Sequence, residues 1–369
     1  MMIRGKILFI ISNLGQGGAE RQLIELVKNI DKNLYDVSLC LYAINKGIFF
    51  KEVENISGIN LIKNHLHQKN KILKILEAIL FIHKYLKKNK FDIVHTSLFM
   101  NGALVRLSAP RNYKNRIVYN VRTSFNLYTT KLLLLERLLI NKSYLITNSK
   151  SAYKDFVKYF PTKYKAKIDY IYNGFDTEKF KPATKQISKK ITIGSVGRIH
   201  HIKNHLQILR VFNGIENTKL RLMIIGDDGG QKAIMEKFIS ENNLKQFIQI
   251  VPQQQNIEEY YNKFDIFILS SFLEGCPNVL FEAMLCKCFC IISKNANSDD
   301  FIVDGSNGLV YDGTDDDLKV KLEYAINMKD SDEFENIRVT GYEYAKNNFS
   351  MEKMIKSYEQ YYFKIHNIP

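Results

Sequence analysis

The stretch DIFILSSFLEGCPNVLFEAML, residues 265–285, decides the fold. Its apolar beginning, residues 265–270, predicts a buried strand, and the turn that follows contains Gly275 and Pro277. A helical pattern then begins near Asn278. A strand that leads through a short turn into a helix is the repeating unit of a parallel sheet covered by helices, so the segment predicts an α/β protein.

The same alternation of short apolar runs and helical patterns extends in both directions. Strands separated by helices form parallel sheets covered on both faces, so the pattern predicts two successive doubly wound sheets. The polar, aperiodic segment 181–190, which contains Pro182, is interpreted as the linker between them. Predicted strands are 6–11, 37–42, 92–95, 117–121, 144–147, 191–196, 220–225, 248–251 and 265–270, and predicted helices are 19–30, 72–86, 132–140, 205–212, 232–242, 257–263 and 279–285.

Length and composition agree with this organisation. The chain has 369 residues, enough for two α/β domains, and its 46% hydrophobic and 25% charged residues are typical of a folded protein. No apolar run approaches the roughly 20 residues that cross a bilayer. The short run Ile7 to Ile11 leads into glycines and is interpreted as a first strand, not as a signal peptide.

The five cysteines are odd in number and mostly clustered, unlike a secreted disulfide framework. We therefore expect reduced thiols in a cytoplasmic protein. The alternation of three cysteines near position 288 is interpreted as one face of a strand end, because a zinc site would need a second ligand pair. The cysteines are Cys40, Cys276, Cys286, Cys288 and Cys290.

The formal charge of +15 is unevenly distributed along the chain. Residues 1–185 carry 32 Lys and Arg against 13 Asp and Glu, a balance of +19, whereas residues 186–369 carry 21 against 25, a balance of −4. The basic half predicts an anionic partner, which could be a membrane surface, a polyanionic acceptor or a nucleic acid.

Three segments contain residue types that bind a diphosphate or a sugar. Residues 15–20, Gly-Gln-Gly-Gly-Ala-Glu, join a strand to a helix whose free N–H groups attract anions, although a glycine turn without a ligand is an equal alternative. Arg198 ends a strand and Lys203 lies just before a helix. Both cations could converge on one pyrophosphate, or they could be a solvated pair.

The third segment contains two acids near a helix start. Glu274 precedes the helix that begins near Asn278, and Glu282 lies about two turns further along. These carboxylates could hold the vicinal hydroxyls of a sugar and of a ribose; a capping acid and an exposed acid are the alternative. The backbone N–H groups of Val279 and Leu280 would face an anion.

Residues 274–284, Glu-Gly-Cys-Pro-Asn-Val-Leu-Phe-Glu-Ala-Met, resemble the E-x7-E signature of the retaining family-4 glycosyltransferases, also called glycosyltransferase group 1. The resemblance implies the GT-B fold, two Rossmann-like domains that face each other across a cleft. It implies an acceptor domain over 1–182, a donor domain over 183–345 and a C-terminal helix, 346–369, that packs back toward the first domain. Further matching segments, in the family's order, are 17–20, 92–95, 171–182, 197–198 with 203–204, 224–227 and 307–309.

The resemblance also implies residue roles. Arg198 and Lys203 would neutralise the leaving pyrophosphate, Glu274 would hold the transferred sugar, and Glu282 would bind the ribose. It implies retention of anomeric configuration, no divalent metal and no cofactor, since the nucleotide sugar is a substrate. The residues assigned to catalysis are Arg198, Lys203 and Glu274, and those assigned to donor binding are Gly17, Gly18, Asn278, Val279, Leu280 and Glu282.

The sequence departs from the family pattern in places. Arg122 stands where the family often has a histidine, so we assign acceptor binding to His95 and Arg122 together. His95 at a strand end has the alternative of being a core histidine. Lys287 and Phe289 replace a usual Gly and Pro.

We therefore predict a metal-independent hexosyltransferase that moves a sugar from a UDP-sugar, or a GDP-sugar, to a glycan or lipid-linked acceptor in bacterial cell-surface polysaccharide or glycoconjugate synthesis. It would be cytoplasmic and peripheral on the inner face of the membrane, held through its basic N-terminal half, with no nucleic-acid partner. Two alternatives remain: a GT-B-like sugar-nucleotide epimerase, and a non-enzymatic nucleic-acid-binding protein suggested by charge alone.

Overall fold

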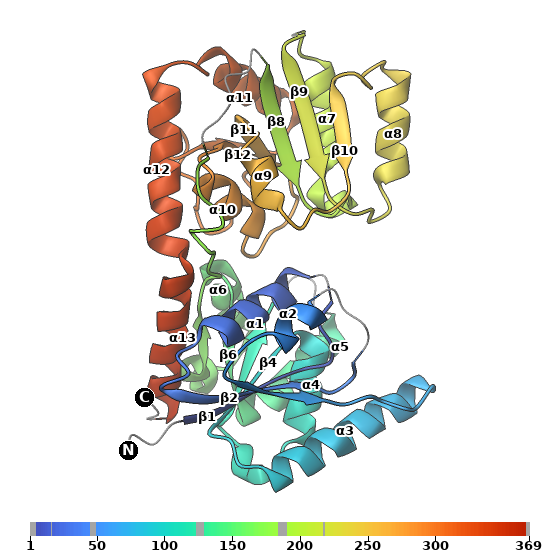
Figure 1. Cartoon of the computed structure of the whole chain (residues 1–369), viewed down its shortest axis with the longest axis vertical. Helices are drawn as coiled ribbons and strands as arrows, with labels where there is room; N and C mark the ends of the chain where they lie inside the picture. Colours follow the sequence, from blue (N-terminus) through green and yellow to red (C-terminus); the bar gives the residue numbers. More distant parts are fainter. Residues whose placement is uncertain are drawn as a thin grey trace. The chain divides into compact units, whose positions relative to one another are not determined.

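The computed structural model describes residues 5–15, 17–44, 49–122, 129–183, 190–216 and 218–366. The chain divides into two compact units, coloured by sequence in Figure 1. Unit 1 comprises residues 1–174 together with 351–369, and unit 2 comprises residues 175–350. The divisions therefore fall at 174/175 and 350/351, where the sequence had suggested 182/183 and 345/346. Of the expected linker, residues 184–189 lie outside the described residues.

Unit 1 is built on a seven-stranded parallel sheet in the order β3-β2-β1-β4-β5-β6-β7. The strand order reverses between β1 and β4. Its elements are β1 (Gly5–Ile11), α1 (Gly18–Asn29), β2 (Tyr35–Leu41), α2 (Phe50–Glu54), β3 (Ile59–Lys63), α3 (Lys71–Lys88), β4 (Ile93–Ser97), α4 (Phe99–Ser108), β5 (Ile117–Val121), α5 (Thr130–Leu139), β6 (Ser143–Thr147), α6 (Lys150–Tyr159), β7 (Ile168–Tyr170) and α13 (Met351–His366).

The core of unit 1 lies on both faces of this sheet. Along β1, Ile7 and Phe9 pack with α1 and α13 on one face, while Leu8 and Ile10 pack with α3 and α4 on the other. Side chains alternate between the faces of a strand, so a sheet covered twice requires an uninterrupted apolar run. This requirement explains why β1 is apolar at nearly every position.

Unit 2 is built on a six-stranded parallel sheet in the order β10-β9-β8-β11-β12-β13, which reverses between β8 and β11. Two doubly wound sheets were predicted, and both are present. The elements are β8 (Ile191–Val196), α7 (His205–Asn213), β9 (Leu220–Ile225), α8 (Lys232–Glu241), β10 (Ile248–Val251), α9 (Ile257–Tyr261), β11 (Ile266–Leu269), α10 (Asn278–Leu285), β12 (Phe289–Ser293), β13 (Leu309–Tyr311), α11 (Asp315–Asn327) and α12 (Asp332–Phe349).

Ligands of open parallel sheets bind beyond the carboxyl ends of the strands, at the point where the strand order reverses. In unit 2 this point lies between the segments that follow β8 and β11, which carry Arg198, Lys203 and Glu274. In unit 1 it lies between the segments that follow β1 and β4. In the described part of the chain, no helix has the length and apolar character of a membrane span.

Candidate active site

An ion pair joins the two segments that meet at the reversal point of unit 2. The Nζ atom of Lys203 lies 2.5 Å from Oε1 of Glu274, and the two side chains are 27% and 11% exposed. The sequence assigned catalytic roles to both residues, and the fold brings them together although 71 positions separate them. The pair leaves both groups close enough to the surface to exchange partners with a ligand.

Two serines that the sequence analysis did not single out hold this pair in place. Ser271 donates from its hydroxyl to Oε1 of Glu274 at 2.7 Å. The hydroxyl of Ser270 lies 2.9 Å from the carbonyl oxygen of Lys203, which fixes the backbone that carries the lysine. Both serines are buried at the end of β11. Their position at the carboxyl end of a predicted strand was the signal that could have identified them.

Arg198 lies beside this pair in sequence, and glycines make room for its backbone and side chain. A Cβ atom at Gly226, just after β9, would lie 2.0 Å from the carbonyl oxygen of Gly197, so position 226 must be glycine. A Cβ atom at Gly229 would lie 2.9 Å from Cγ of Arg198. The Arg198 side chain is exposed and makes no ion pair with any described residue. Its guanidinium is therefore available to an anion.

At the start of helix α10, three residues were assigned to donor binding, and one of their backbone N–H groups has no hydrogen-bond partner among the described residues. The N–H of Leu280 donates to the carbonyl oxygen of Pro277 at 3.0 Å, and that of Asn278 donates to Cys276 at 3.0 Å. The N–H of Val279 has no hydrogen-bond partner within the described ranges. In this conformation Val279 is the amide that an anion would reach first.

Glu282, the second acid of the motif, is oriented by a buried tyrosine. The hydroxyl of Tyr261 donates to Oε2 of Glu282 at 2.8 Å. Burial, and then the neighbouring Glu282 carboxylate, hold the pKa of Tyr261 well above its usual range, so the hydroxyl keeps its proton and remains a donor. Tyr261 was not identified from the sequence, because only the fold brings α9 against α10.

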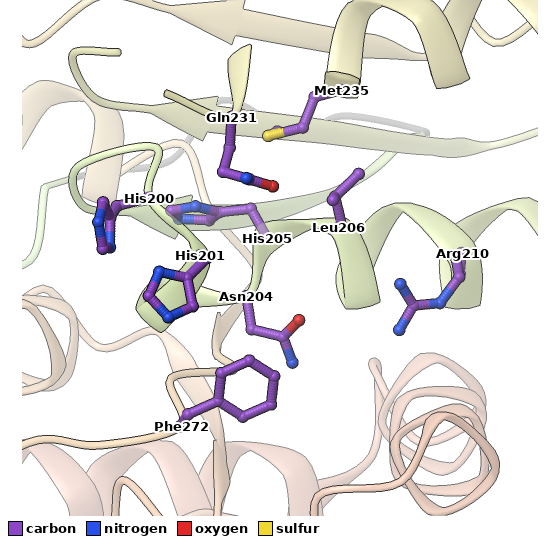
Figure 2. Close-up of a pocket in the computed structure, with 9 residues that line it drawn as sticks. All are labelled: His200, His201, Asn204, His205, Leu206, Arg210, Gln231, Met235 and Phe272. Atoms are coloured by element: carbon purple, nitrogen blue, oxygen red, sulfur yellow. The ribbon is translucent and has the colours of Figure 1, made fainter. Parts of the chain in front are cut away.

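A small hollow lies beside the segment between β8 and α7. Figure 2 shows the rings of His200, His201 and His205 around it, with Phe272 opposite. His205 is buried, and burial followed by the charge of Lys203 lowers its pKa to about 3. This histidine is therefore neutral at physiological pH and supplies no charge to the hollow.

In unit 1, Gly17 and Gly18 stand at the beginning of α1, as the sequence predicted for an anion-binding turn. Gly17 is the residue before the helix, and a Cβ atom there would lie 2.4 Å from Oε2 of Glu20. The carboxylate of the helix's own first turn thus rests against the glycine turn. A phosphate that approached the same N–H groups would have to share this space with Glu20.

His95 of unit 1 is completely buried in the middle of β4, two residues before Ser97, and not at the strand end that the sequence predicted, because β4 runs on beyond position 95. Its Nδ1 atom lies 2.7 Å from the hydroxyl of Tyr362 in α13, and its Nε2 atom has no partner among the described residues. Burial, followed by the charge of Arg122, lowers the pKa of His95 to about 3, so the ring is neutral. A neutral and buried ring can orient neighbouring groups but does not attract an anion by charge.

Other polar groups with unused hydrogen-bonding capacity gather at the same strand ends. Ser97 and Asn120 are neighbours across β4 and β5, and both have a buried oxygen atom without a partner in the described structure. Arg122 donates to Oδ1 of Asn173, while its Nε atom is unpartnered. Buried polar atoms in folded proteins are normally hydrogen-bonded, so this edge is built to receive a polar group or ordered water.

The backbone beside this edge is also strained. Leu98, which follows Ser97, has φ of 71° and ψ of 146°, a region that residues with a side chain rarely adopt. Strained residues concentrate at functional sites, where the surrounding structure holds them in place. The strain and the unpartnered polar atoms both mark the ends of β4 and β5 as the candidate site of unit 1.

The cysteines form no disulfide: all five are free thiols, and four of them are buried. Within the described ranges, no group of His, Cys, Asp and Glu side chains is arranged to hold a metal ion. The Cys286 and Cys288 side chains lie in the interior around β12 and Tyr261.

Unit 2 thus has cations at the reversal point of a parallel sheet and acids beside the start of a helix. The family model described as "Glycosyl transferases group 1" matches residues 176–343, and that described as "Glycosyltransferase Family 4" matches residues 16–179. The chain belongs to the group 1 glycosyltransferases.

Relatives and solved structures agree with this family. The capsular polysaccharide biosynthesis glycosyltransferase CapH of Staphylococcus aureus is 27% identical over 82% of this chain and 85% of its own length. The UDP-Gal:alpha-D-GlcNAc-diphosphoundecaprenol alpha-1,3-galactosyltransferase of Escherichia coli is 27% identical over 73% of this chain and 71% of its own.

The crystal structure of HepE from Anabaena in complex with UDP-glucose superposes with a TM-score of 0.80. It is 18% identical to this chain and covers 96% of it and 98% of its own length. At this identity the likeness concerns the fold, and it confirms the predicted GT-B architecture of two Rossmann-like domains.

Proposed function

We propose that this glycosyltransferase moves a hexose from a nucleotide sugar, with a UDP-sugar favoured and a GDP-sugar possible, to a glycan or lipid-linked acceptor. The observation that carries the proposal is the Lys203–Glu274 pair, with the exposed Arg198 on the same segment after β8. The cations would stabilise the diphosphate as it leaves, and Glu274 would hold hydroxyls of the transferred sugar. The names of HepE's ligand and of the Escherichia coli relative's donor support a UDP-sugar.

The reaction would retain the anomeric configuration without a covalent enzyme intermediate. The bond from the anomeric carbon to the diphosphate oxygen breaks as an oxocarbenium-like state forms, and the acceptor oxygen bonds to that carbon on the same face. The acceptor proton passes to the leaving phosphate. The residues proposed for the donor diphosphate and ribose are Gly17, Gly18, Asn278, Val279, Leu280 and Glu282, and no metal or cofactor takes part.

The acceptor would be assembled at the membrane during synthesis of a bacterial surface polysaccharide or glycoconjugate. CapH is named for capsular polysaccharide, and the Escherichia coli relative is named for an acceptor linked to diphosphoundecaprenol. Arg122, just after β5, and His95, buried within β4, are proposed to arrange the acceptor, Arg122 by contact and His95 from beneath. The protein would work in the cytoplasm, at the inner face of the membrane, without a nucleic-acid partner.

A donor screen tests the proposal. The full-length protein is incubated with UDP-, GDP- and ADP-sugars, with and without a diphosphoundecaprenol-linked sugar, and the released nucleotide is measured. We expect release from a UDP-sugar, stimulated by the acceptor and unaffected by EDTA. Loss of activity in EDTA with rescue by Mg2+ would contradict the metal-free mechanism. A rearranged sugar formed without acceptor would favour the epimerase alternative.

A further inference from the structure

Helix α3 exposes a row of large apolar side chains in unit 1. Ile72 is 70% exposed, Leu76 is 49% exposed and Leu80 is 58% exposed. Residues four positions apart lie on the same face of a helix, so these three form one stripe, and Leu73 at 48% widens it. The outward face of a surface helix is normally polar.

These side chains are not needed to attach α3 to its own domain. The opposite face of the helix is buried through Ala78, Ile82 and Leu86, which pack against β1, β2 and α4. The exposed stripe is therefore additional to the core. Figure 1 shows α3 along the outer side of unit 1, with α4 as its neighbour.

The charge around the stripe is predominantly positive. Residues 63–90 contain eight lysines and one acid, Glu77. The Glu77 carboxylate accepts hydrogen bonds from the N–H groups of His67 and Gln68 at 3.0–3.1 Å, and these bonds lower its pKa. Lys84 lies four residues after Leu80 and continues the same face of the helix. Among described residues, Lys63 alone of the eight has an ion-pair partner, Glu54.

We propose that α3 docks on an anionic lipid surface, with its apolar stripe at the boundary between headgroups and acyl chains. Lys84, Lys87 and Lys88 would lie against lipid phosphates. A basic helix with one apolar face is the pattern that binds this way, because apolar burial and charge attraction act on the same surface. The proposal deepens the proposed function, since a lipid-linked acceptor would then lie beside unit 1. Exposed leucines also lie on α4, which packs against α3, and on α5, which packs against α4: Leu107, Leu134 and Leu138.

Vesicle sedimentation tests the charge component. The full-length protein is mixed at low salt with vesicles of phosphatidylcholine alone or with 30% phosphatidylglycerol. We expect sedimentation with the anionic vesicles only. The triple variant Lys84→Gln, Lys87→Gln, Lys88→Gln should bind about a hundredfold more weakly, since one lysine near an acidic surface contributes a factor of about five. The matched control replaces three exposed lysines of unit 2, Lys232→Gln, Lys237→Gln and Lys319→Gln, and should bind like the wild type.

A second variant separates docking of α3 from general attraction of a basic protein. Ile72→Ser, Leu76→Ser, Leu80→Ser leaves the charge unchanged and should weaken binding about tenfold or more. Val303→Ser with Val320→Ser is its control, because both valines are about 60% exposed in unit 2. Equal binding of the apolar variant and the wild type would overturn the proposal. So would equal sedimentation with neutral vesicles, or a wild-type dimer that the apolar variant converts to a monomer.

The outcome can be read independently of the proposed reaction. Each variant is also assayed for nucleotide release from the UDP-sugar with a detergent-dispersed acceptor, where a docking surface is not required. Binding to anionic vesicles without activity on any donor would refute the reaction and leave α3 docking intact. Full activity without vesicle binding would refute the docking alone.

Discussion

Replacement of Glu274 by alanine should separate catalysis from folding. The side chain contacts Lys203 and Ser271 and is 11% exposed, so its carboxylate is fixed before any ligand arrives. Loss of one such preorganised group typically lowers kcat by about 10²–10³, or about 3–4 kcal/mol of barrier. Ser271→Ala keeps the carboxylate and removes one hydrogen bond to a charged group, so a decrease of about tenfold is expected, corresponding to roughly 1.4 kcal/mol.

The assay is nucleotide release from the UDP-sugar that the donor screen identifies, with circular dichroism and thermal unfolding to verify each fold. Glu335→Ala is the control, because this acid of α12 is 52% exposed and paired with Arg338, away from the motif in sequence. Near-normal turnover by a correctly folded Glu274→Ala protein would refute the site assignment. A greater loss in Ser271→Ala than in Glu274→Ala would refute the argument that the serine acts through the carboxylate.

Three further outcomes are expected. Arg198→Ala and Lys203→Ala should each lower kcat/KM by about a hundredfold, while in Arg198→Ala, where no ion pair is lost, stability changes by about 0.5 kcal/mol or less; wild-type kinetics in both would move the diphosphate site elsewhere. Buried His95 and His205 have pKa values of about 3, against about 6.5 when unfolded, so the unfolded chain binds more protons between these values. Urea titrations should show that the free energy of unfolding is lower at pH 5 than at pH 7.5 by about 2 kcal/mol per histidine. Replacement of either histidine by glutamine should remove about 2 kcal/mol of this pH dependence. Lys287→Gly should raise the unfolding free energy by about 0.5–1 kcal/mol, because Lys287 has a φ of 54°; an unchanged or lower value would show that the lysine is not strained.

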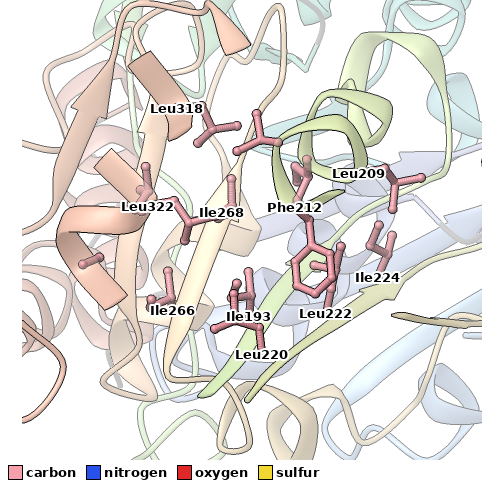
Figure 3. Packing of buried hydrophobic residues seen from close by; sticks show 14 of the residues in the cluster. Ile193, Leu209, Phe212, Leu220, Leu222, Ile224, Ile266, Ile268, Leu318 and Leu322 are labelled. Carbon is pink, nitrogen blue, oxygen red and sulfur yellow. The ribbon is translucent and has the colours of Figure 1, made fainter. Parts of the chain in front are cut away.

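Continuous apolar runs made the central strands predictable. Strands β5, β8 and β9 have the bounds expected from the sequence, and so does β10 at the edge of the unit 2 sheet. Figure 3 shows the reason in unit 2. Ile193, Leu222 and Ile268 come from neighbouring strands and lie in the same buried cluster, on a face of the sheet that helices cover. A strand buried on both faces must be apolar at almost every position, and such a run is visible without any knowledge of its partners.

Short or atypical elements escaped this approach. Strands β7 and β13 have three residues each, too few to show a period. Strand β12 begins at Phe289, within the segment of alternating cysteines. From the sequence, that alternation was interpreted as a strand end, and Phe289 was noted only as a departure from a family motif, so no bounds were predicted for the strand. These strands extend one side of each sheet, and β3, which was not predicted either, extends the other side of the unit 1 sheet, so the predicted sheets were narrower than the observed ones.

The charged residues of the candidate site could be proposed from the sequence, but the residues that hydrogen-bond to them could not. The spacing of Glu274 and Glu282 marked both acids, but the hydroxyl partners Ser271 and Tyr261 depend on how loops and helices meet. The contact between His95 and Tyr362 joins residues 267 positions apart, and no local pattern encodes such a distance. Arrangements of this kind follow from packing, which a single sequence does not display.

Unit 1 is assembled from both ends of the chain, residues 1–174 and 351–369, and this has a consequence during synthesis. Its core includes five α13 side chains, Met354, Ile355, Tyr358, Tyr361 and Tyr362. The ribosome makes the 176 residues of unit 2 before it reaches them, which takes about 9–35 s at roughly 5–20 residues per second. Unit 2 can therefore finish folding first, while unit 1 waits with one face of its sheet incompletely covered. A nascent chain stalled before Met351 would expose that face to chaperones and proteases, so the part made first is the part completed last.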